Sequence, residues 1–170
     1  MGAFTEFAAT TSAIEPDQMG AFTEFAAARG AIGAAEEVVI NQSSPQRMYT
    51  EVVLQRDGEL AGQLDAVTGT WTGLLARGFT GGVYILLRHG SGAVIGVTGL
   101  HTFGVDGRWV GRSNRTDYWS EGFDPRVAAA TEELHLIQLH SPKDRYEAIL
   151  AEVEQKVQLA REAAKRLGLI

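Results

Sequence analysis

The sequence predicts a mainly β protein with a C-terminal α-helix, in which an antiparallel meander closes into a small barrel or a strongly curved sheet. Residues 48–114 alternate between apolar and polar positions and are punctuated by glycine turns, and residues 142–167 carry an apolar stripe at helical spacing. The chain has 170 residues, which suits one domain and a tail. We place the tail at residues 1–40 and the β-barrel-like domain at residues 41–170.

The tail contains a duplicated segment. The nine residues MGAFTEFAA occur at 1–9 and again at 19–27. In each copy two phenylalanines and an alanine have helical spacing, so we expect either two short amphipathic helices separated at Pro16 or a flexible tail. Two copies of one short motif are typical of a docking segment, because the second copy raises avidity through effective concentration.

Glycine turns divide the middle of the chain into about seven short strands. Asp57-Gly58 predicts a two-residue hairpin turn, because a type I′ turn needs positive φ at both positions. Asp106-Gly107 gives the same signal, and residues 134–139 are expected to form a later strand after a longer connection at residues 117–130. Beside the first turn, the residues that alternate on one face are Leu60, Gly62, Leu64 and Ala66.

The C-terminal segment predicts one long amphipathic helix at residues 142–167. Ser141 is its expected N-cap, Pro142 its first residue and Gly168 its terminator. Such a helix must cover an apolar surface, which is either its own sheet or a second copy of the chain. The stripe comprises Tyr146, Ile149, Leu150, Val153, Val157, Ala160, Ala164 and Leu167.

Composition excludes several classes of protein. The net charge of −6 and the lack of a basic cluster argue against nucleic acid as a partner. With no cysteine, the chain has no disulfide and no thiolate metal site. No apolar run approaches the length of a membrane span, and the N-terminus has no basic leader, so we expect a cytoplasmic protein.

His101 is the first candidate for chemistry. The odd positions of residues 93–105 are mostly apolar, so the imidazole is expected to point inward from a strand. It is then either a core histidine with satisfied ring nitrogens or a catalytic or ligand-contacting group. Residues 112–119 add charged and aromatic groups that form either a polar rim on a cavity or an ion-paired loop. The catalytic candidates are His101, Tyr84, Arg112 and Asp117.

Aromatic residues at strand spacing are the ligand-binding candidates, although the same spacing is common in an ordinary core. These candidates are Trp71, Phe103, Trp109 and Tyr118. We expect no metal, because His101, His135 and His140 have no paired ligand spacing. We also expect no cofactor, and no phosphate-binding glycine loop for a nucleotide is present. The chain has no serine-hydrolase elbow, so a serine hydrolase is not supported.

Two triplets resemble family signatures. Gly69-Thr70-Trp71 and Thr116-Asp117-Tyr118 resemble the G-x-W and T-D-Y signatures of lipocalins, which are eight-stranded ligand-binding barrels followed by a helix. The resemblance covers six of 170 residues, and the triplets are separated by too few residues to hold the family's six intervening strands. It implies a ligand-binding barrel without assigning the chain to the family.

Two functions follow as hypotheses. In the first, the barrel holds a small, largely apolar molecule, as a carrier or as a cofactor-independent enzyme of the cyclase or isomerase type. In the second, the chain is a non-catalytic, homo-oligomeric assembly or interaction protein that uses the duplicated segment as a docking arm.

Overall fold

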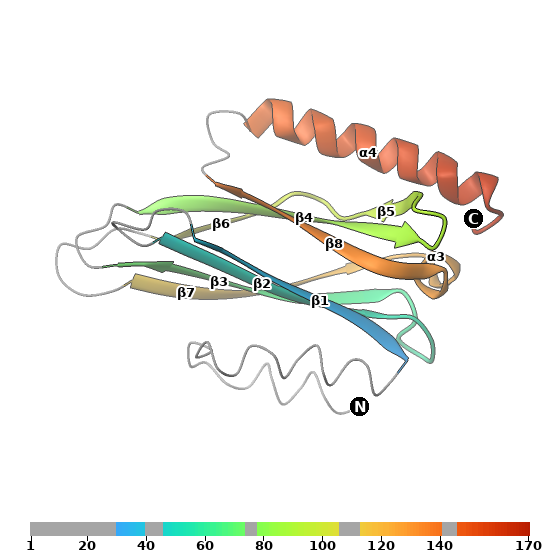
Figure 1. Ribbon diagram of the computed structural model, residues 1–170, viewed down its shortest axis with the longest axis horizontal. Helices are drawn as coiled ribbons and strands as arrows, with labels where there is room; N and C mark the ends of the chain where they lie inside the picture. Colours follow the sequence, from blue (N-terminus) through green and yellow to red (C-terminus); the bar gives the residue numbers. More distant parts are fainter. Residues whose placement is uncertain (1–29, 40–45, 74–77, 106–112, 141–145) are drawn as a thin grey trace.

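The computed structural model describes residues 30–39, 46–73, 78–105, 113–140 and 146–170. They form three layers, namely two facing antiparallel β-sheets and one long helix on the outside of one of them (Figure 1). The duplicated segment, Asp106-Gly107 and the predicted N-terminal end of the helix lie outside the described residues.

Sheet A is four-stranded and antiparallel, in the order β1-β2-β3-β7. Inward-facing residues of β2 and β3 alternate with residues on the outer face, as the pleat of a strand requires. The strands of sheet A are β1 (Ala31–Val39), β2 (Gln46–Gln55), β3 (Gln63–Thr72) and β7 (Ser113–Gly122).

Sheet B is built around β4. One edge of β4 pairs with β5 and then β6, and its other edge pairs with β8. Because β4 lies between sheet A and the C-terminal helix, both of its faces are buried. The strands of sheet B are β4 (Phe79–His89), β5 (Val94–Val97), β6 (His101–Val105) and β8 (Thr131–His140).

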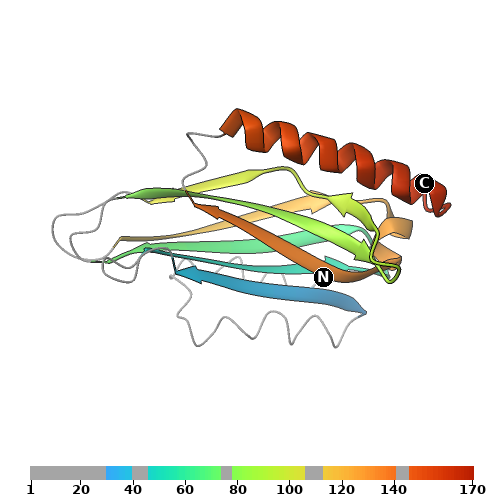
Figure 2. The same ribbon diagram turned by 45° about the horizontal axis from the view of Figure 1, so that its top comes forward.

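The two sheets do not close into a barrel among the described residues, so the prediction of a closed barrel is corrected to two facing sheets (Figure 2). No backbone ladder joins β1 to β8 or β6 to β7 in the described strands. Side chains bridge these corners instead. Gln138 Nε2 donates to the carbonyl of Glu36 at 2.9 Å, and His101 meets Glu121 at the other corner.

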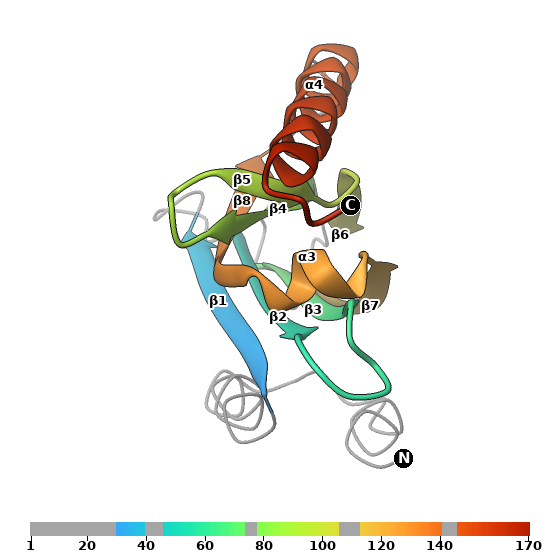
Figure 3. The same cartoon turned by 90° about the vertical axis from the view of Figure 1, so that its right-hand side faces the viewer.

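The C-terminal helix α4 (Tyr146–Arg166) covers the outer face of sheet B (Figure 3). Val153 and Ala160, which are 2% exposed, pack against Tyr84 and Leu86. The helix ends as predicted. Gly168 has a φ of 69°, and the amide of Leu169 donates to the carbonyl of Ala164 at 2.9 Å. The predicted amphipathic helix is therefore confirmed over the described residues.

The space between the sheets contains two apolar clusters. The larger one lies toward the short helix α3 (Pro125–Ala129), and each fully buried leucine in it contributes roughly 1.5–3 kcal/mol. The smaller one, hereafter the β6-side cluster, lies around the part of β4 that pairs with β6, and it also includes Met48 near the start of β2. The β6-side cluster comprises Met48, Phe79, Val83, Phe103 and Val105.

Three local predictions differ from the structure. Residues 31–39, placed in the tail, form edge strand β1, so the helical or flexible interpretation is wrong there. The expected two-residue turn at Asp57-Gly58 is a longer loop at residues 56–62, which the amide of Gly62 closes onto the carbonyl of Gln55. Leu60 is 50% exposed in that loop and does not belong to β3.

The third difference concerns residues 93–105, which form two strands and not one. The β4–β5 ladder shifts register between Leu87 and Arg88, and Thr98–Leu100 separates β5 from β6. Val97 therefore packs under α4, whereas Phe103 points into the sandwich. The predicted single face holds for β6 and not across the break.

Candidate functional site

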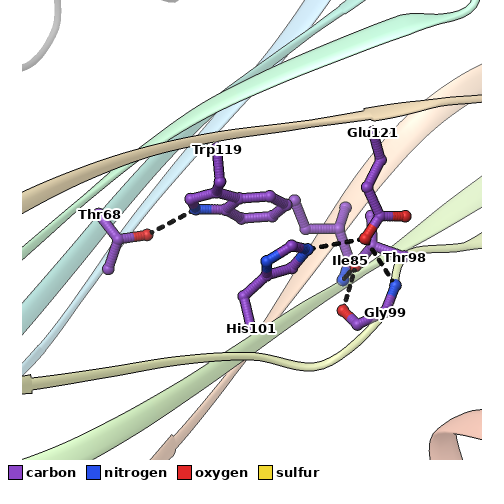
Figure 4. A network of polar contacts seen from close by, with 7 residues as sticks. All are labelled: Thr68, Ile85, Thr98, Gly99, His101, Trp119 and Glu121. Atoms are coloured by element: carbon purple, nitrogen blue, oxygen red, sulfur yellow. Dashed lines mark hydrogen bonds and ion pairs between the residues drawn. The ribbon is translucent and has the colours of Figure 1, made fainter.

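The candidate site lies at the corner where β6 of sheet B meets β7 of sheet A (Figure 4). In the β4–β6 register His101 lies opposite Val83, a buried interior residue, so His101 is on the inward face as the alternation predicted. On β7, Trp119 and Glu121 share the inward face, because they lie opposite Ala66 and the buried Leu64 of β3.

An imidazole and a carboxylate form the centre of the site. His101 Nε2 lies 2.7 Å from Glu121 Oε1, and the two side chains are 28% and 26% exposed. The same carboxylate oxygen accepts a hydrogen bond from the backbone amide of Gly99 at 2.8 Å. An ionised carboxylate only accepts, so Nε2 carries the proton in this pair. Nδ1 has no hydrogen-bond partner among the described residues.

The break between β5 and β6 makes the Gly99 amide available. At the break, the hydroxyl of Thr98 takes the place of a ladder carbonyl and accepts from the amide of Ile85 at 2.9 Å. The Thr98 hydroxyl in turn donates to the carbonyl of Gly99 at 3.0 Å. A Cβ at Gly99 would lie 3.2 Å from Glu121 Oε1, so glycine permits this close approach of the carboxylate.

An indole ring supports the imidazole. The rings of His101 and Trp119 stack with centroids 4.0 Å apart and an interplanar angle of 24°. Trp119 Nε1 donates to the hydroxyl of Thr68 at 3.1 Å, and this hydroxyl also lies 3.1 Å from that of Thr50. Phe103 extends the aromatic surface, with its centroid 6.5 Å from that of His101. The indole is thus held by ring stacking on His101 and by a hydrogen bond from its N–H group to Thr68.

Buried polar atoms without partners lie next to this network. The hydroxyls of Thr70 and Thr72 and Oδ2 of Asp117 make no hydrogen bond with any described residue. Thr70 and Thr72 follow Thr68 on the inward face of β3, and Asp117 lies opposite Thr68 in the ladder. Buried polar groups normally have a partner, so these three oxygens are exceptions among the described residues.

The charge of Asp117 is partly compensated. Its Oδ1 accepts hydrogen bonds from Nε and Nη2 of Arg115 at 2.9 and 2.7 Å. The Arg115 side chain is 58% exposed, so the pair lies at the rim of the corner. The ion-paired alternative for residues 112–119 therefore describes Asp117 within the described part of that range.

The structure brings together only some of the predicted site residues. His101 and Phe103 meet at the corner, and Asp117 is two residues from Trp119 on β7. Trp71 lies on the outer face of sheet A folded over Gly69, and Tyr118 is 48% exposed on that same face. Arg112 and Trp109 lie outside the described residues.

Tyr84 lies on the opposite face of sheet B from His101. It is 5% exposed and packs under α4. Burial raises the pKa of the Tyr84 phenol, the negative charge of Glu152 raises it further, and Lys156 lowers it. A phenol in this position belongs to the helix–sheet contact and does not reach the corner.

Trp119, Glu121 and Thr68 are the functional candidates that the sequence reasoning missed. The signal was available, because Asp117, Trp119 and Glu121 alternate at strand spacing. The longer connection predicted at residues 117–130 is wrong in its first part, because residues 117–122 belong to strand β7.

No cluster of histidine or acidic side chains suited to a metal ion occurs among the residues that the structure describes. In the same part of the chain, none of the helices combines the length and the hydrophobicity needed to cross a bilayer. His135 is exposed on β8 and does not approach His101, which points into the sandwich.

Comparisons with protein-family models, with curated proteins and with solved structures gave no match. The fold and the site therefore define only a class: an antiparallel two-sheet protein with a half-buried imidazole–carboxylate pair at one corner.

Proposed function

We propose that the protein binds a small, largely apolar molecule at the β6–β7 corner and acts on it by cofactor-independent proton transfer, with His101 as the base. The observation that carries the proposal is the His101–Glu121 pair, in which Nε2 is held by the carboxylate and Nδ1 is left for a ligand. With about a quarter of each side chain exposed, the pair is reachable from solvent.

The surroundings of the pair suit a general base. The Glu121 carboxylate orients the imidazole, and it stabilises the positive charge that His101 gains on taking a proton. The face of Trp119 lies against the same ring and also favours a cation. The Gly99 amide keeps the carboxylate in position, so the pair is preorganised before a ligand arrives.

The neighbouring interior provides the remaining features of a binding site. The β6-side cluster offers apolar contacts, and the unpaired oxygens of Thr70, Thr72 and Asp117 offer a few polar ones. Pockets for small molecules typically combine a mostly apolar lining with a small number of placed polar groups. A ligand with an apolar body and a weakly acidic C–H or O–H group fits this combination.

Native mass spectrometry of the purified full chain, to detect a co-purified molecule, is the first test. The second uses nitrobenzisoxazole, an apolar probe that reports a general base. The base removes its C–H proton, the N–O bond breaks, and a coloured cyanophenolate forms. We expect probe turnover above that in buffer. It should fall at least about tenfold in His101→Gln, and less in Glu121→Gln, because the base keeps its nitrogen there.

The matched control is His135→Gln, which removes an exposed imidazole from β8 and should leave turnover unchanged. The proposal fails if no ligand co-purifies and probe turnover is the same in the parent chain, His101→Gln and His135→Gln.

A further inference from the structure

The outer face of sheet A carries buried side chains that no described element covers. Val53, Glu51 and Val67 are 3%, 2% and 4% exposed, and they face away from the residues of β2 and β3 that fill the interior. The helix α4 lies beyond sheet B, and no described helix or strand lies against the outer face of sheet A (Figures 1 and 3).

Burial also raises the pKa of titratable groups on this face. Burial raises the pKa of the Asp65 carboxyl, although a hydrogen bond from Gln63 opposes the change. It also raises the pKa of the Tyr49 phenol, and the negative charge of Glu51 adds to the effect. Asp65 lies directly opposite Val53, and Tyr49 lies on the same strand and face as Val53, so the desolvation extends beyond the two valines.

Length and position identify the segment of chain that can cover this face. The segments between the described ranges have four to seven residues and connect strand or helix ends, so they are too short. Residues 1–29 precede β1, which is the edge strand of sheet A. Gly30, with a φ of 67°, lets the chain reverse direction at the start of β1.

We propose that residues 1–29 dock on the outer face of sheet A in the same molecule, with the phenylalanines of both copies of MGAFTEFAA against Val53 and Val67. The dimensions agree. Four strands at about 4.8 Å spacing span roughly 14 Å, and two helices side by side at about 8–10 Å cover that width. Each copy presents two phenylalanines, so the duplication doubles the large apolar side chains that the segment can bring to the face.

The chain has no cysteine, which makes thiol accessibility a clean assay. We would place a single reporter, Val67→Cys, in the full chain and measure its rate of reaction with a thiol reagent. The docking variant replaces all four phenylalanines, as Phe4→Ser, Phe7→Ser, Phe22→Ser and Phe25→Ser. The matched control replaces polar residues of the same copies, as Glu6→Ser and Glu24→Ser.

We expect the reporter to react slowly in the parent and in the control, and about tenfold faster or more in the docking variant. Leu60→Cys, in the exposed loop, should react quickly in every background. If Val67→Cys prevents folding, Val53→Cys reports on the same face.

Two outcomes would overturn the proposal. The first is a reporter that reacts at the same rate in the docking variant and the parent. The second is a loss of protection of the reporter thiol on dilution of the parent, at the concentration where its mass falls to that of a single chain. In that case a second copy of the chain, and not residues 1–29 of the same molecule, covers the face.

Discussion

Replacing Thr68 by valine tests how much the hydrogen bond between the Trp119 indole and Thr68 contributes to stability. The Thr68 hydroxyl accepts from Trp119 Nε1 at 3.1 Å and pairs with Thr50 at 3.1 Å. Valine has nearly the same shape but no hydroxyl, so Thr68→Val removes both hydrogen bonds without leaving a cavity. The indole N–H and the Thr50 hydroxyl then lose their partner in the interior.

The size of the effect follows from these contacts. A buried donor left without an acceptor costs about 1–3 kcal/mol, and Trp119 is only partly buried. We therefore expect Thr68→Val to lower the free energy of unfolding by about 2 kcal/mol. For a denaturant slope of about 2 kcal/mol per molar urea, the midpoint should fall by roughly 1 M.

Thr70 provides the matched control two residues along the same strand face. Thr70 is fully buried, and its hydroxyl has no partner among the described residues. Thr70→Val therefore removes a hydroxyl that loses its hydration on folding and makes no hydrogen bond in return. Urea unfolding should show unchanged stability or a gain of up to about 1 kcal/mol. If Thr70→Val destabilises as much as Thr68→Val, the argument that hydrogen-bond satisfaction separates these two threonines is wrong.

Two further predictions concern the stability of the fold away from the candidate site. Because the pKa of Tyr84 is raised above its ordinary value of 10.0, the folded state binds its proton more tightly than the unfolded state, so stability is lost as pH rises. Urea midpoints measured between about pH 9 and 11 should fall less steeply in Tyr84→Phe, while the contribution of Tyr49 remains; an unchanged slope would contradict this. Gly62→Ala should destabilise by about 2–3 kcal/mol in thermal or urea unfolding, because Gly62 has a φ of 94° and an added Cβ would collide with the carbonyl of Phe123. Gly58→Ala, at a φ of 76° with open space around it, should cost only about 1 kcal/mol, and equal losses would show that the collision is unimportant.

Local patterns predicted much of one half of the site. The alternation of residues 101–105 put His101 and Phe103 on one inward face, and β6 keeps that register. The partners of His101 were harder to predict, because Glu121 and Trp119 belong to a strand of the other sheet. Sequence spacing does not specify which strands meet at a corner, since that depends on how two sheets are packed together.

The predicted catalytic set mixed residues from both faces of sheet B. Tyr84 and His101 both lie on apolar strands, and both faces of β4 are buried, one by sheet A and the other by α4. A strand that is apolar on both sides carries no alternation that tells the two faces apart. Only the packing of α4 assigned Tyr84 to the helix side.

Patterns among neighbouring residues are sufficient to predict a mainly β chain, its inward and outward alternation, and a C-terminal helix that ends before Gly168. Strand period, helix period and positive φ are properties of a few consecutive residues, so they can be recognised in the linear chain. The division of the strands into two sheets and the meeting of His101 and Glu121 across a corner are visible only in the folded molecule. Those outcomes depend on contacts between residues far apart in the chain, where the gain from burying one face against another selects among many possible pairings.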